Sequence, residues 1–381
     1  MSSSSDPRAL VVTWASGGNL PPLLAAAQLL SARGFRVHVL ASQATRTAAS
    51  ERGFPTLAYR RAPEPDETAP FESQAAQLSA QAAGTDLARD VLEVVRESAA
   101  DLLVADCMLP AALAAGKAAG LPTVSVVHFP YAHARSVMTR RGGAWTTDRA
   151  TLDATRRELR LQPTASNLDA WESPELLLAT LPRWFDAPGE LPAHIVHAGP
   201  LGVRPHSADS RVPSRRQALL AFSTTVMQGQ ERLVENACAA LELAGVEGLF
   251  TRGPAVARSG IHNAAGVETV DFVDHDDVMP LCDVVVTHGG LGTTLRALAH
   301  GRPLLILPLG RDQPFNASRV AELGAGLTLR SDAPAANIAE ALTRLYAEST
   351  YRDVASELAA AIALERPDTR ATEALSGLVL R

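Results

Sequence analysis

The sequence predicts an α/β protein with two doubly wound domains, each built on a parallel sheet, and a cleft between them. Strand-like apolar runs alternate with helix-like segments along most of the chain, which is the pattern of parallel sheets covered by helices. The length of 381 residues exceeds one ordinary domain and suits two. A stretch rich in Gly, Pro, Ser and charge at residues 197–214 interrupts the alternation and indicates a linker.

The first strand and helix lie at the start of the chain. The continuous apolar run "ALVVTWA" (9–15) is typical of a strand covered on both faces. The segment "GGNLPPLLAAAQLLSARG" (17–34) predicts a glycine turn and then a helix, because its prolines fit a first turn and Gly34 fits the end. The run "FRVHVLAS" (35–42) predicts the next strand.

Two further strands complete the first half. They are "DLLVADCM" (101–108) and "PTVSVVHF" (122–129), joined by the alanine-rich helix "PAALAAGKAAG" (110–120). The segment "RAPEPDETAP" (61–70) is rich in proline and acid, and it predicts a long irregular loop. Loops of this length in compact domains are often functional or mobile.

The strand and helix rhythm restarts after the linker. Strands are expected at "QALLAFSTT" (217–225), "CDVVVTHGG" (282–290) and "RPLLILPL" (302–309), with a helix that begins at about Thr293. The expected organisation is therefore an N-terminal domain at 1–200, a linker at 201–214, a second domain at 215–365 and a C-terminal helix at 366–381.

Composition disfavours several classes of protein. The net charge of −6 and pI near 5.9 are unlike a non-specific nucleic-acid binder. The chain has no apolar run of roughly 18 residues, and its start "MSSSSDPR" lacks a signal-peptide core. Cys107, Cys238 and Cys282 match no metal spacing and suit a reducing compartment. We expect a cytoplasmic protein without a metal or a nucleic-acid or membrane partner.

The glycine-rich stretch from His288 to Gly292 is the strongest chemical signal. It follows a strand and precedes a helix, so backbone N–H groups and a helix N-terminus would meet there as an anion site. A diphosphate is the expected anion, and His288 would add a donor. The alternative is that these glycines only form a tight turn.

Three segments in this half carry a family resemblance. The segments "THGGLGTT" (287–294), "ALAHGRPLLILPL" (297–309) and "DQPFNASRV" (312–320) resemble the nucleotide-sugar motif of the GT-B glycosyltransferases, specifically family 1 enzymes of the bacterial natural-product type. The run "LLAFSTTVMQGQERL" (219–233) and the N-terminal glycine turn are similar to other parts of that family. The resemblance implies two Rossmann-like domains with sheets facing across a cleft. It also implies that the C-terminal helix folds back on the N-terminal domain.

The resemblance further implies a function. The protein would be an inverting, metal-independent glycosyltransferase that moves a sugar from a nucleotide diphosphate to a small aglycone such as a polyketide or phenol. It would need no cofactor beyond the donor substrate. The resemblance leaves open whether the protein is a homodimer. The rival interpretations are a non-catalytic helper of the same fold and a nucleotide-sugar 2-epimerase.

Donor-binding roles also follow from the resemblance. His288 would contact a donor phosphate, and Asp312 and Gln313 would hydrogen-bond the sugar hydroxyls. The alternative for Asp312 is a solvated loop acid. Residues expected near the diphosphate or the nucleobase are Thr224, Thr225, Val273 within Phe272 to His275, Gly289, Gly290, Gly292 and Thr293.

Arg296 departs from the family pattern. Many members have a glutamate there that resembles a clamp on the ribose hydroxyls, and an arginine cannot accept those hydrogen bonds. A donor whose nucleotide lacks the 2′-hydroxyl would miss the glutamate less, so Arg296 favours a dTDP-linked donor such as a dTDP-deoxysugar. The alternative is a surface arginine that says nothing about the donor.

The N-terminal turn departs from the family pattern as well. The family usually places a histidine there as the base that deprotonates the acceptor, and Gly18 stands in its place, between Gly17 and Asn19. Glycine cannot accept a proton. The turn therefore resembles a retained scaffold without its base, in which Asn19 could orient the ligands.

Asp106 and His128 are the candidate bases. Each ends a predicted strand, and parallel sheets bind ligands at the carboxyl ends of strands. Asp106 resembles the family's aspartate that supports the missing histidine, and His128 titrates near neutrality. The alternatives are that Asp106 caps the following helix, or that a phenolic acceptor is acidic enough to need no base. A phenolate is also nucleophilic at carbon, so a C-linked product is open.

Aromatic and basic residues follow His128. Phe129, Tyr131 and Trp145 lie among several arginines, a combination that suits a flat, polar acceptor. The alternative is ordinary packing between domains.

Overall fold

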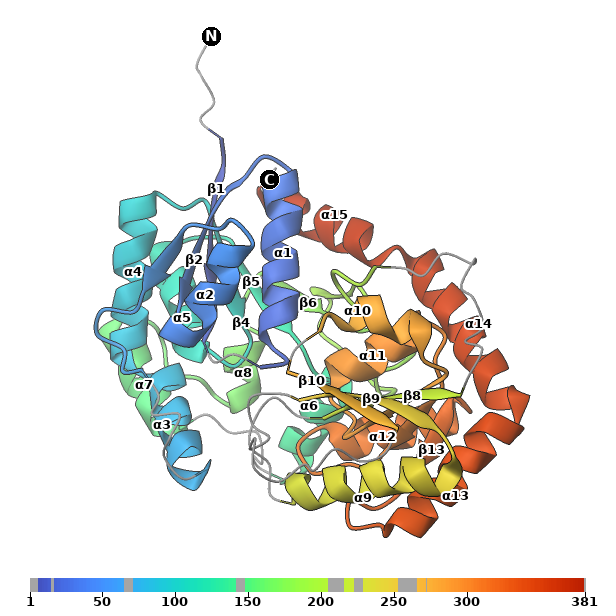
Figure 1. Ribbon diagram of the computed structural model, residues 1–381. Coiled ribbons are helices and arrows are strands. Elements are labelled where there is room, and N and C mark those ends of the chain that lie inside the picture. The colour runs from blue at the N-terminus through green and yellow to red at the C-terminus, as the bar shows by residue number, and fades with distance from the viewer. Residues whose placement is uncertain are drawn as a thin grey trace. The chain divides into compact units, whose positions relative to one another are not determined.

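The computed structural model describes residues 6–14, 17–64, 71–141, 148–204, 216–222, 229–252, 266–271 and 273–379. The chain divides into two units (Figure 1). Unit 1 comprises Met1–Gly202 and Pro367–Arg381, and unit 2 comprises Val203–Arg366. Each unit is an α/β structure with its own sheet and core.

The sheet of unit 1 has seven strands among the described residues, in the order β3-β2-β1-β4-β5-β6-β7. Every pairing is parallel. The strands are β1 (Arg8–Val12), β2 (Arg36–Ala41), β3 (Thr56–Ala58), β4 (Leu102–Asp106), β5 (Thr123–Val127), β6 (Leu176–Ala179) and β7 (Ile195–His197). The strand order reverses between β1 and β4, and doubly wound sheets bind ligands at such a switch point.

The helices of unit 1 cover both faces of this sheet. They are α1 (Leu20–Ala32), α2 (Gln43–Glu51), α3 (Phe71–Ala83), α4 (Thr85–Ser98), α5 (Pro110–Ala119), α6 (Tyr131–Arg141), α7 (Arg149–Glu158), α8 (Asn167–Trp171) and α15 (Pro367–Val379). Alternate residues of β1 enter different cores: Val11 packs with α1, whereas Leu10 and Val12 pack with α4 and α5. This alternation follows from the two-residue period of a strand.

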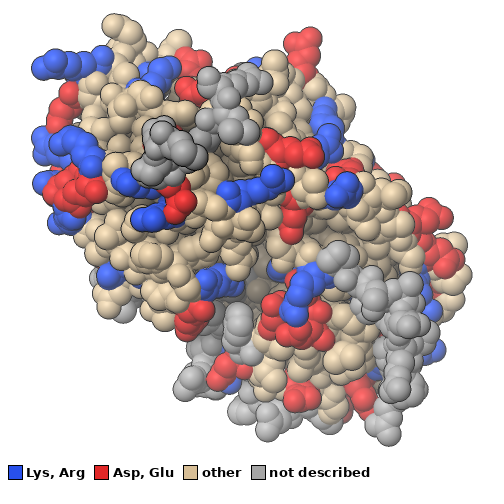
Figure 2. All heavy atoms as spheres, turned by 90° about the horizontal axis from the view of Figure 1, so that it is seen from above, with Lys and Arg blue, Asp and Glu red and all other residues tan. Residues whose placement is uncertain are grey.

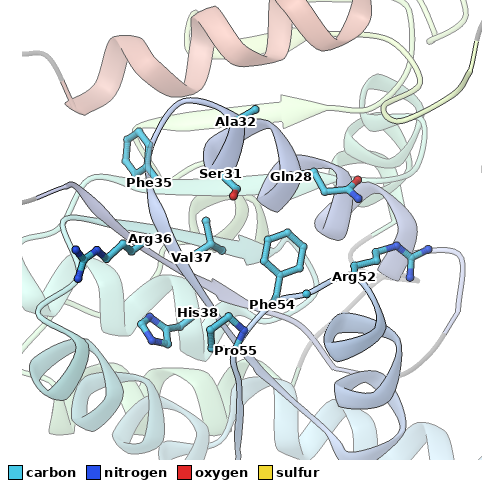
Figure 3. A pocket seen from close by; sticks show the side chains of 11 residues that line it. Gln28, Ser31, Ala32, Phe35, Arg36, Val37, His38, Arg52, Phe54 and Pro55 are labelled. Carbon is cyan, nitrogen blue, oxygen red and sulfur yellow. The ribbon is translucent and has the colours of Figure 1, made fainter.

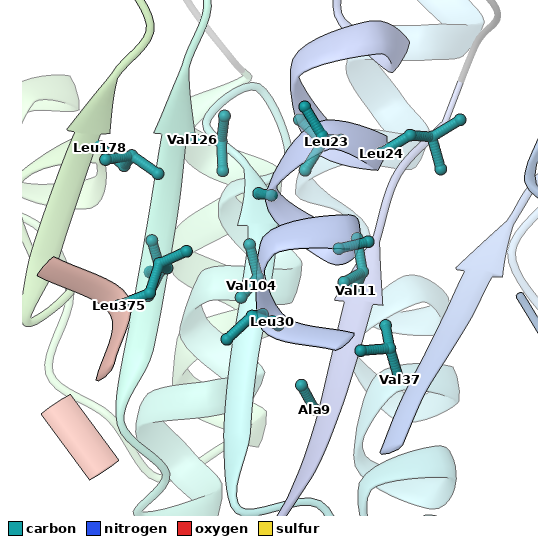
Figure 4. Close-up of a cluster of buried hydrophobic side chains, with 14 of the residues drawn as sticks. Ala9, Val11, Leu23, Leu24, Leu30, Val37, Val104, Val126, Leu178 and Leu375 are labelled. Atoms are coloured by element: carbon teal, nitrogen blue, oxygen red, sulfur yellow. The ribbon is translucent and has the colours of Figure 1, made fainter. Parts of the chain in front are cut away.

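The last helix, α15, belongs to the core of unit 1. Ala371 and Leu375 are fully or nearly fully buried in the cluster that contains Val104, Val126 and Leu178, and Figure 4 shows Leu375 beside the sheet. The two residues are one helical turn apart and so share a face. Burying a leucine side chain contributes about 1.5–3 kcal/mol, which holds this C-terminal segment to unit 1.

Unit 2 repeats the doubly wound pattern. Its sheet has the order β10-β9-β8-β11-β12-β13 and is parallel throughout the described pairings. The strands are β8 (Gln217–Ala221), β9 (Glu247–Thr251), β10 (Val267–Val270), β11 (Val284–Thr287), β12 (Leu304–Ile306) and β13 (Gly326–Thr328). The helices are α9 (Gln230–Ala244), α10 (His275–Val278), α11 (Leu291–Ala299), α12 (Gln313–Glu322), α13 (Ala335–Ala347) and α14 (Ser349–Glu365), with a 3-10 turn at Met279–Leu281.

The two parallel, doubly wound sheets confirm the predicted fold class. One boundary differs: α11 begins at Leu291 instead of Thr293, because Gly290 already has the extended backbone of a residue that precedes a helix. The three cysteines are buried and form no disulfide.

The surface and the helix lengths add two observations. On the face shown in Figure 2, the described basic and acidic side chains are interspersed and form no continuous basic surface. None of the helices in the described part of the chain is long and apolar enough to cross a membrane.

Candidate active site

The switch point of unit 1 brings the N-terminal turn to Asp106. Val12 of β1 pairs with Ala105 of β4, so the chain that leaves β1 passes the end of β4. Trp14 and Asn19 both donate to the same carboxylate oxygen of Asp106: Trp14 Nε1 lies 3.0 Å and Asn19 Nδ2 lies 2.9 Å from Oδ2. Asn19 stands at the N-cap position of α1 but makes no side-chain cap hydrogen bond. Its side chain points its amide N–H at Asp106 instead.

The second oxygen of Asp106 has two further donors. The backbone N–H of Met108 lies 2.8 Å and His128 Nε2 lies 3.0 Å from Oδ1. The Asp106 side chain is fully buried, whereas the His128 side chain is 17% exposed. The four contacts hold the carboxylate in one orientation and join the two candidate bases, Asp106 and His128, in one pair.

The protonation of this pair follows from its contacts. Burial by itself raises the pKa of Asp106, but His128 and the N–H donors of Met108 and Asn19 outweigh burial and hold this pKa below its usual value. Burial lowers the pKa of His128, but the Asp106 carboxylate outweighs burial and raises this pKa well above its usual value. Near neutral pH the pair is therefore an aspartate beside an imidazolium, and neither group is a ready base.

The neighbouring titratable groups are neutral. Burial raises the pKa of Cys107, and burial with the charge of Asp106 raises the pKa of Tyr59 well above its usual value. Burial and the nearby Glu172 raise the pKa of Tyr131. Cys107, Tyr59 and Tyr131 thus add no charge of their own beside Asp106 and His128.

Asp106, Cys107 and His128 also place one possible metal-ligand atom each within 4.8 Å of one another, a grouping that the sequence did not indicate. The carboxylate, however, already accepts four hydrogen bonds, two on each oxygen, which leaves it no lone pair for a cation. These residues do not fit a divalent cation well, and the expectation of a metal-independent protein stays a prediction.

One alternative for Asp106 is wrong. Helix α5 begins at Pro110 after Leu109, and it has no side-chain cap. Asp106 lies too far before this helix and receives the Met108 N–H instead.

Phe129 and Tyr131 lie in the interior of unit 1. Phe129 is 3% exposed and Tyr131 is fully buried. The Phe129 ring lies 5.2 Å from that of Trp171, and the Tyr131 hydroxyl donates to Glu172 Oε1 at 2.8 Å. Both rings therefore pack within unit 1 behind the surface, and a contact with the acceptor stays a prediction. Trp145 lies outside the described residues.

The glycine turn of unit 2 lies between β11 and α11. Gly289 has a φ of +89°, and a Cβ there would lie 2.7 Å from Ile306 Cγ2. A Cβ on Gly290 would lie 2.9 Å from His288 Nε2, whereas one on Gly292 would meet nothing within 4 Å. Helix α11 has no side-chain cap and no acid in its first turn. Its N-terminal N–H groups are therefore open to an anion at Gly292 and Thr293.

His288 lies in this turn as a neutral imidazole. Its side chain is buried, and burial lowers its pKa to about 4. A hydrogen bond with the Ala221 backbone raises this pKa, and the charge of Arg311 on the next loop lowers it. A neutral imidazole has one N–H, for which the Ala221 backbone and a phosphate would compete, and it adds no positive charge at neutral pH.

Asp312, Gln313 and Asn316 surround the end of β12. Asn316 is fully buried, and its Nδ2 donates to the Gly289 carbonyl and to Asp312 Oδ2, both at 2.9 Å. Gln313 Oε1 accepts from the N–H groups of Leu309 and Gly310, at 2.8 and 3.0 Å. Asn316 thus connects the glycine turn to Asp312 through hydrogen bonds. The side-chain oxygen of Gln313, in contrast, already accepts hydrogen bonds from the loop that precedes it.

Arg296 is held by a buried acid. Its Nε lies 2.8 Å from Asp276 Oδ1, and His300 Nε2 lies 2.8 Å from the same oxygen. The side chain of Asp276 is 2% exposed and that of Arg296 is 20% exposed. Arg296 is thus a partly buried member of an ion pair, and its bearing on the donor stays a prediction.

Comparisons with known proteins bear on the class and the fold of the chain. Residues 253–376 match the family model described as "Erythromycin biosynthesis protein CIII-like, C-terminal domain". The zeaxanthin glucosyltransferase of Pseudescherichia vulneris is 27% identical over 298 residues, which cover 69% of this chain and 70% of that protein. The present chain is accordingly a glycosyltransferase with the GT-B fold, similar to enzymes of natural-product type.

Solved structures show how far the fold of this glycosyltransferase extends. The glycosyltransferase of kitacinnamycin superimposes with a TM-score of 0.79 at 21% identity and covers 98% of this chain and 99% of its own. The glycosyltransferase VinC in complex with dTDP superimposes with a TM-score of 0.73 at 22% identity and covers 98% of both chains. The likeness thus spans both units and confirms the predicted fold.

Several residues expected in the donor site of this glycosyltransferase are not described. Thr224, Thr225 and Phe272 lie outside the described residues. Val273 is half-buried just before α10, whose N-cap Asp274 accepts from the Asp276 N–H at 3.0 Å. The roles of these residues stay predictions.

Sequence reasoning missed the partners that hold the site. Trp14 and Asp276 gave no motif signal, because each acts on a residue far along the chain. Asn316 had a weak signal, since it stands four residues after Asp312 and such residues meet on a helix.

A surface pocket of about 690 Å³ lies elsewhere on the glycosyltransferase. Figure 3 shows Phe35, Val37 and Phe54 along it, with Arg36 and Arg52 at its sides. It adjoins the amino ends of β2 and β3, whereas ligands of parallel sheets bind at the carboxyl ends. It is therefore separate from the switch point of unit 1.

Proposed function

We propose that this glycosyltransferase moves a sugar, with inversion and without a metal, from a dTDP-linked donor to a small aglycone such as a polyketide or phenol. The observation that carries the donor half is the uncapped N-terminus of α11 beside Gly289 and Gly290. A leaving diphosphate accumulates negative charge, and preorganised N–H groups stabilise such charge without a metal ion. The neutral imidazole of His288 fits a contact with a phosphate, and the carboxylate of Asp312 fits a hydrogen bond from a sugar hydroxyl.

The preference for dTDP rests on Arg296. Arg296 stands at the sequence position where many family members have a glutamate that accepts hydrogen bonds from ribose hydroxyls, and it is paired with the buried Asp276. A guanidinium only donates, so it offers nothing to the proton of a 2′-hydroxyl. The complex of VinC with dTDP provides a related protein with this nucleotide.

Calorimetric titration of the purified protein with dTDP and with UDP tests the donor. The expected result is a clear preference for dTDP. A preference for UDP would remove the argument from Arg296, and binding of neither nucleotide would remove the proposed transferase reaction. The same titration of Arg296→Glu, expected to shift the preference toward UDP, ties the result to this residue.

The missing histidine leaves two linkages of the product open. With glycine at position 18 and an ion pair at Asp106 and His128, the described residues of this edge provide no strong base for the acceptor, and a phenolic acceptor can react at oxygen or at ring carbon. An acid-labile product would identify an O-glycoside. An acid-stable product that retains its phenolic hydroxyl would identify a C-glycoside.

A further inference from the structure

The carboxylate of Asp106 is fixed as an anion by the groups around it. The Trp14 indole N–H, the Asn19 Nδ2 group and the Met108 backbone N–H donate hydrogen bonds to it. These donors contact both oxygens and favour the ionised form of the carboxyl group. The remaining partner, His128 Nε2, therefore donates as well.

A fully buried anion needs a compensating charge. The Asp106 side chain has no exposed surface, and an unpaired buried carboxylate costs several kcal/mol. Among the described residues, His128 is its ion-pair partner, at 3.0 Å. The flanking groups Cys107, Tyr59 and Tyr131 stay neutral because burial raises the pKa of each. His128 is thus an imidazolium, and the carboxylate of Asp106 stabilises its positive charge.

One side of this imidazolium reaches the surface. The His128 side chain is 17% exposed and follows the carboxyl end of β5. The nearby turn is open, since Gly18 is exposed and a Cβ there would meet nothing within 4 Å. An imidazolium at an open, ligand-binding edge of a sheet attracts an oxyanion.

We propose that the acceptor binds at this edge as a phenolate, which the imidazolium of His128 stabilises, and that transfer proceeds without a general base. This inference rests on the proposed glycosyl transfer and names its acceptor class as acidic phenols. Asp106 holds the charge on His128, and Trp14 and Asn19 are positioning residues that keep Asp106 an anion.

The chemical step balances without an enzymatic base. The phenol releases its proton to solvent on binding. The phenolate oxygen then forms a bond to the anomeric carbon, while the bond from that carbon to the diphosphate oxygen breaks. The electron pair leaves with the nucleoside diphosphate, whose charge the N-terminus of α11 stabilises.

Binding of 4-nitrophenol tests this directly, because only its phenolate absorbs visible light. We expect the full-length protein to lower the pKa of bound 4-nitrophenol by about one unit or more, as an opposite charge at close range does. A bound pKa equal to or above that of the free phenol would overturn the proposal, and so would a failure of 4-nitrophenol to bind.

Two variants assign the effect. In His128→Gln the lowering should disappear, whereas in the control His38→Gln, on β2, it should remain. If His128→Gln does not fold, Asp106→Asn serves instead: it keeps the shape but removes the counter-charge, and the lowering should shrink. A lowering that persists unchanged in these site variants would refute the role of His128.

Turnover separates this inference from the proposed function. With the preferred nucleotide sugar and a series of para-substituted phenols, the acidic limb of kcat/KM against pH should move with the pKa of each acceptor. A limb at one pH for every acceptor would identify an enzymatic base, which overturns the inference but retains glycosyl transfer. Absence of nucleotide binding in the calorimetric titration would instead overturn the proposed function.

Discussion

Asn316 links the glycine turn of unit 2 to Asp312, the acid expected to bind the sugar, and its removal should show in both stability and donor binding. Its Nδ2 makes two hydrogen bonds of 2.9 Å, one to the Gly289 carbonyl and one to the Asp312 carboxylate. A neutral hydrogen bond contributes about 1 kcal/mol and one to a charged group about 1.5–3 kcal/mol. Asn316→Ala should therefore destabilise unit 2 by about 2–4 kcal/mol.

The variant should also raise the KM for the nucleotide sugar, because both Gly289 and Asp312 lose their common anchor. Asn236→Ala is a matched control, since Asn236 makes one side-chain hydrogen bond of 3.0 Å, to the Ala333 carbonyl on the same unit. It should cost about 1 kcal/mol and leave the KM unchanged. Urea unfolding and donor titration measure both quantities. A loss below about 0.5 kcal/mol with an unchanged KM would show that Asn316 does not couple the two elements.

Three further predictions concern the site and one concerns the fold. Asp312→Ala should abolish most glycosyl transfer, as measured in a transfer assay beside the unchanged protein. A non-catalytic helper would instead keep its function in this variant. Gly18→His fits an open position and restores an imidazole, so the ratio of turnover with 4-methylphenol to turnover with 4-nitrophenol should rise at least about tenfold; an unchanged ratio would contradict the assignment of Gly18. Burial lowers the folded-state pKa of His288 to about 4 from 6.5, so the unfolded chain takes up its proton first. Stability should fall as pH drops below about 6.5 and level off near 4, by up to about 3 kcal/mol; urea unfolding of His288→Asn should lack this part of the loss. Leu375→Ala should destabilise unit 1 by about 2–5 kcal/mol, and a change below 1 kcal/mol by calorimetry would mean that α15 does not share its core.

Much of the fold could be predicted because its signals are local. The apolar run before Trp14 is buried on both sides of the sheet, as its lack of alternation indicated. The glycines at 289 and 290 form the expected strand-to-helix turn, since a side chain at either position would collide with a neighbour. The short strands β3, β7 and β13 have three residues each, too few for a periodic signal, and pairing with a neighbouring strand defines them.

The candidate site was predictable only in part. Asp106, His128 and Gly18 stood out as residue types at strand ends or in a turn, and the structure joins the first two in one ion pair. Their protonation could not be inferred from the sequence, because His128 alone titrates near neutrality and burial alone would lower its pKa. The contact with Asp106 reverses this direction.

The sequence by itself determined that a glycine turn precedes α11 and that glycine, not histidine, stands at position 18, since both statements need only residue identity and near neighbours. Only the tertiary structure decided which groups surround Asp106 and His128. Trp14, Asn19 and His128 reach Asp106 across 92, 87 and 22 residues of sequence. Charge in a buried site depends on every donor around it, and chain folding brings those donors together from separate strands and turns.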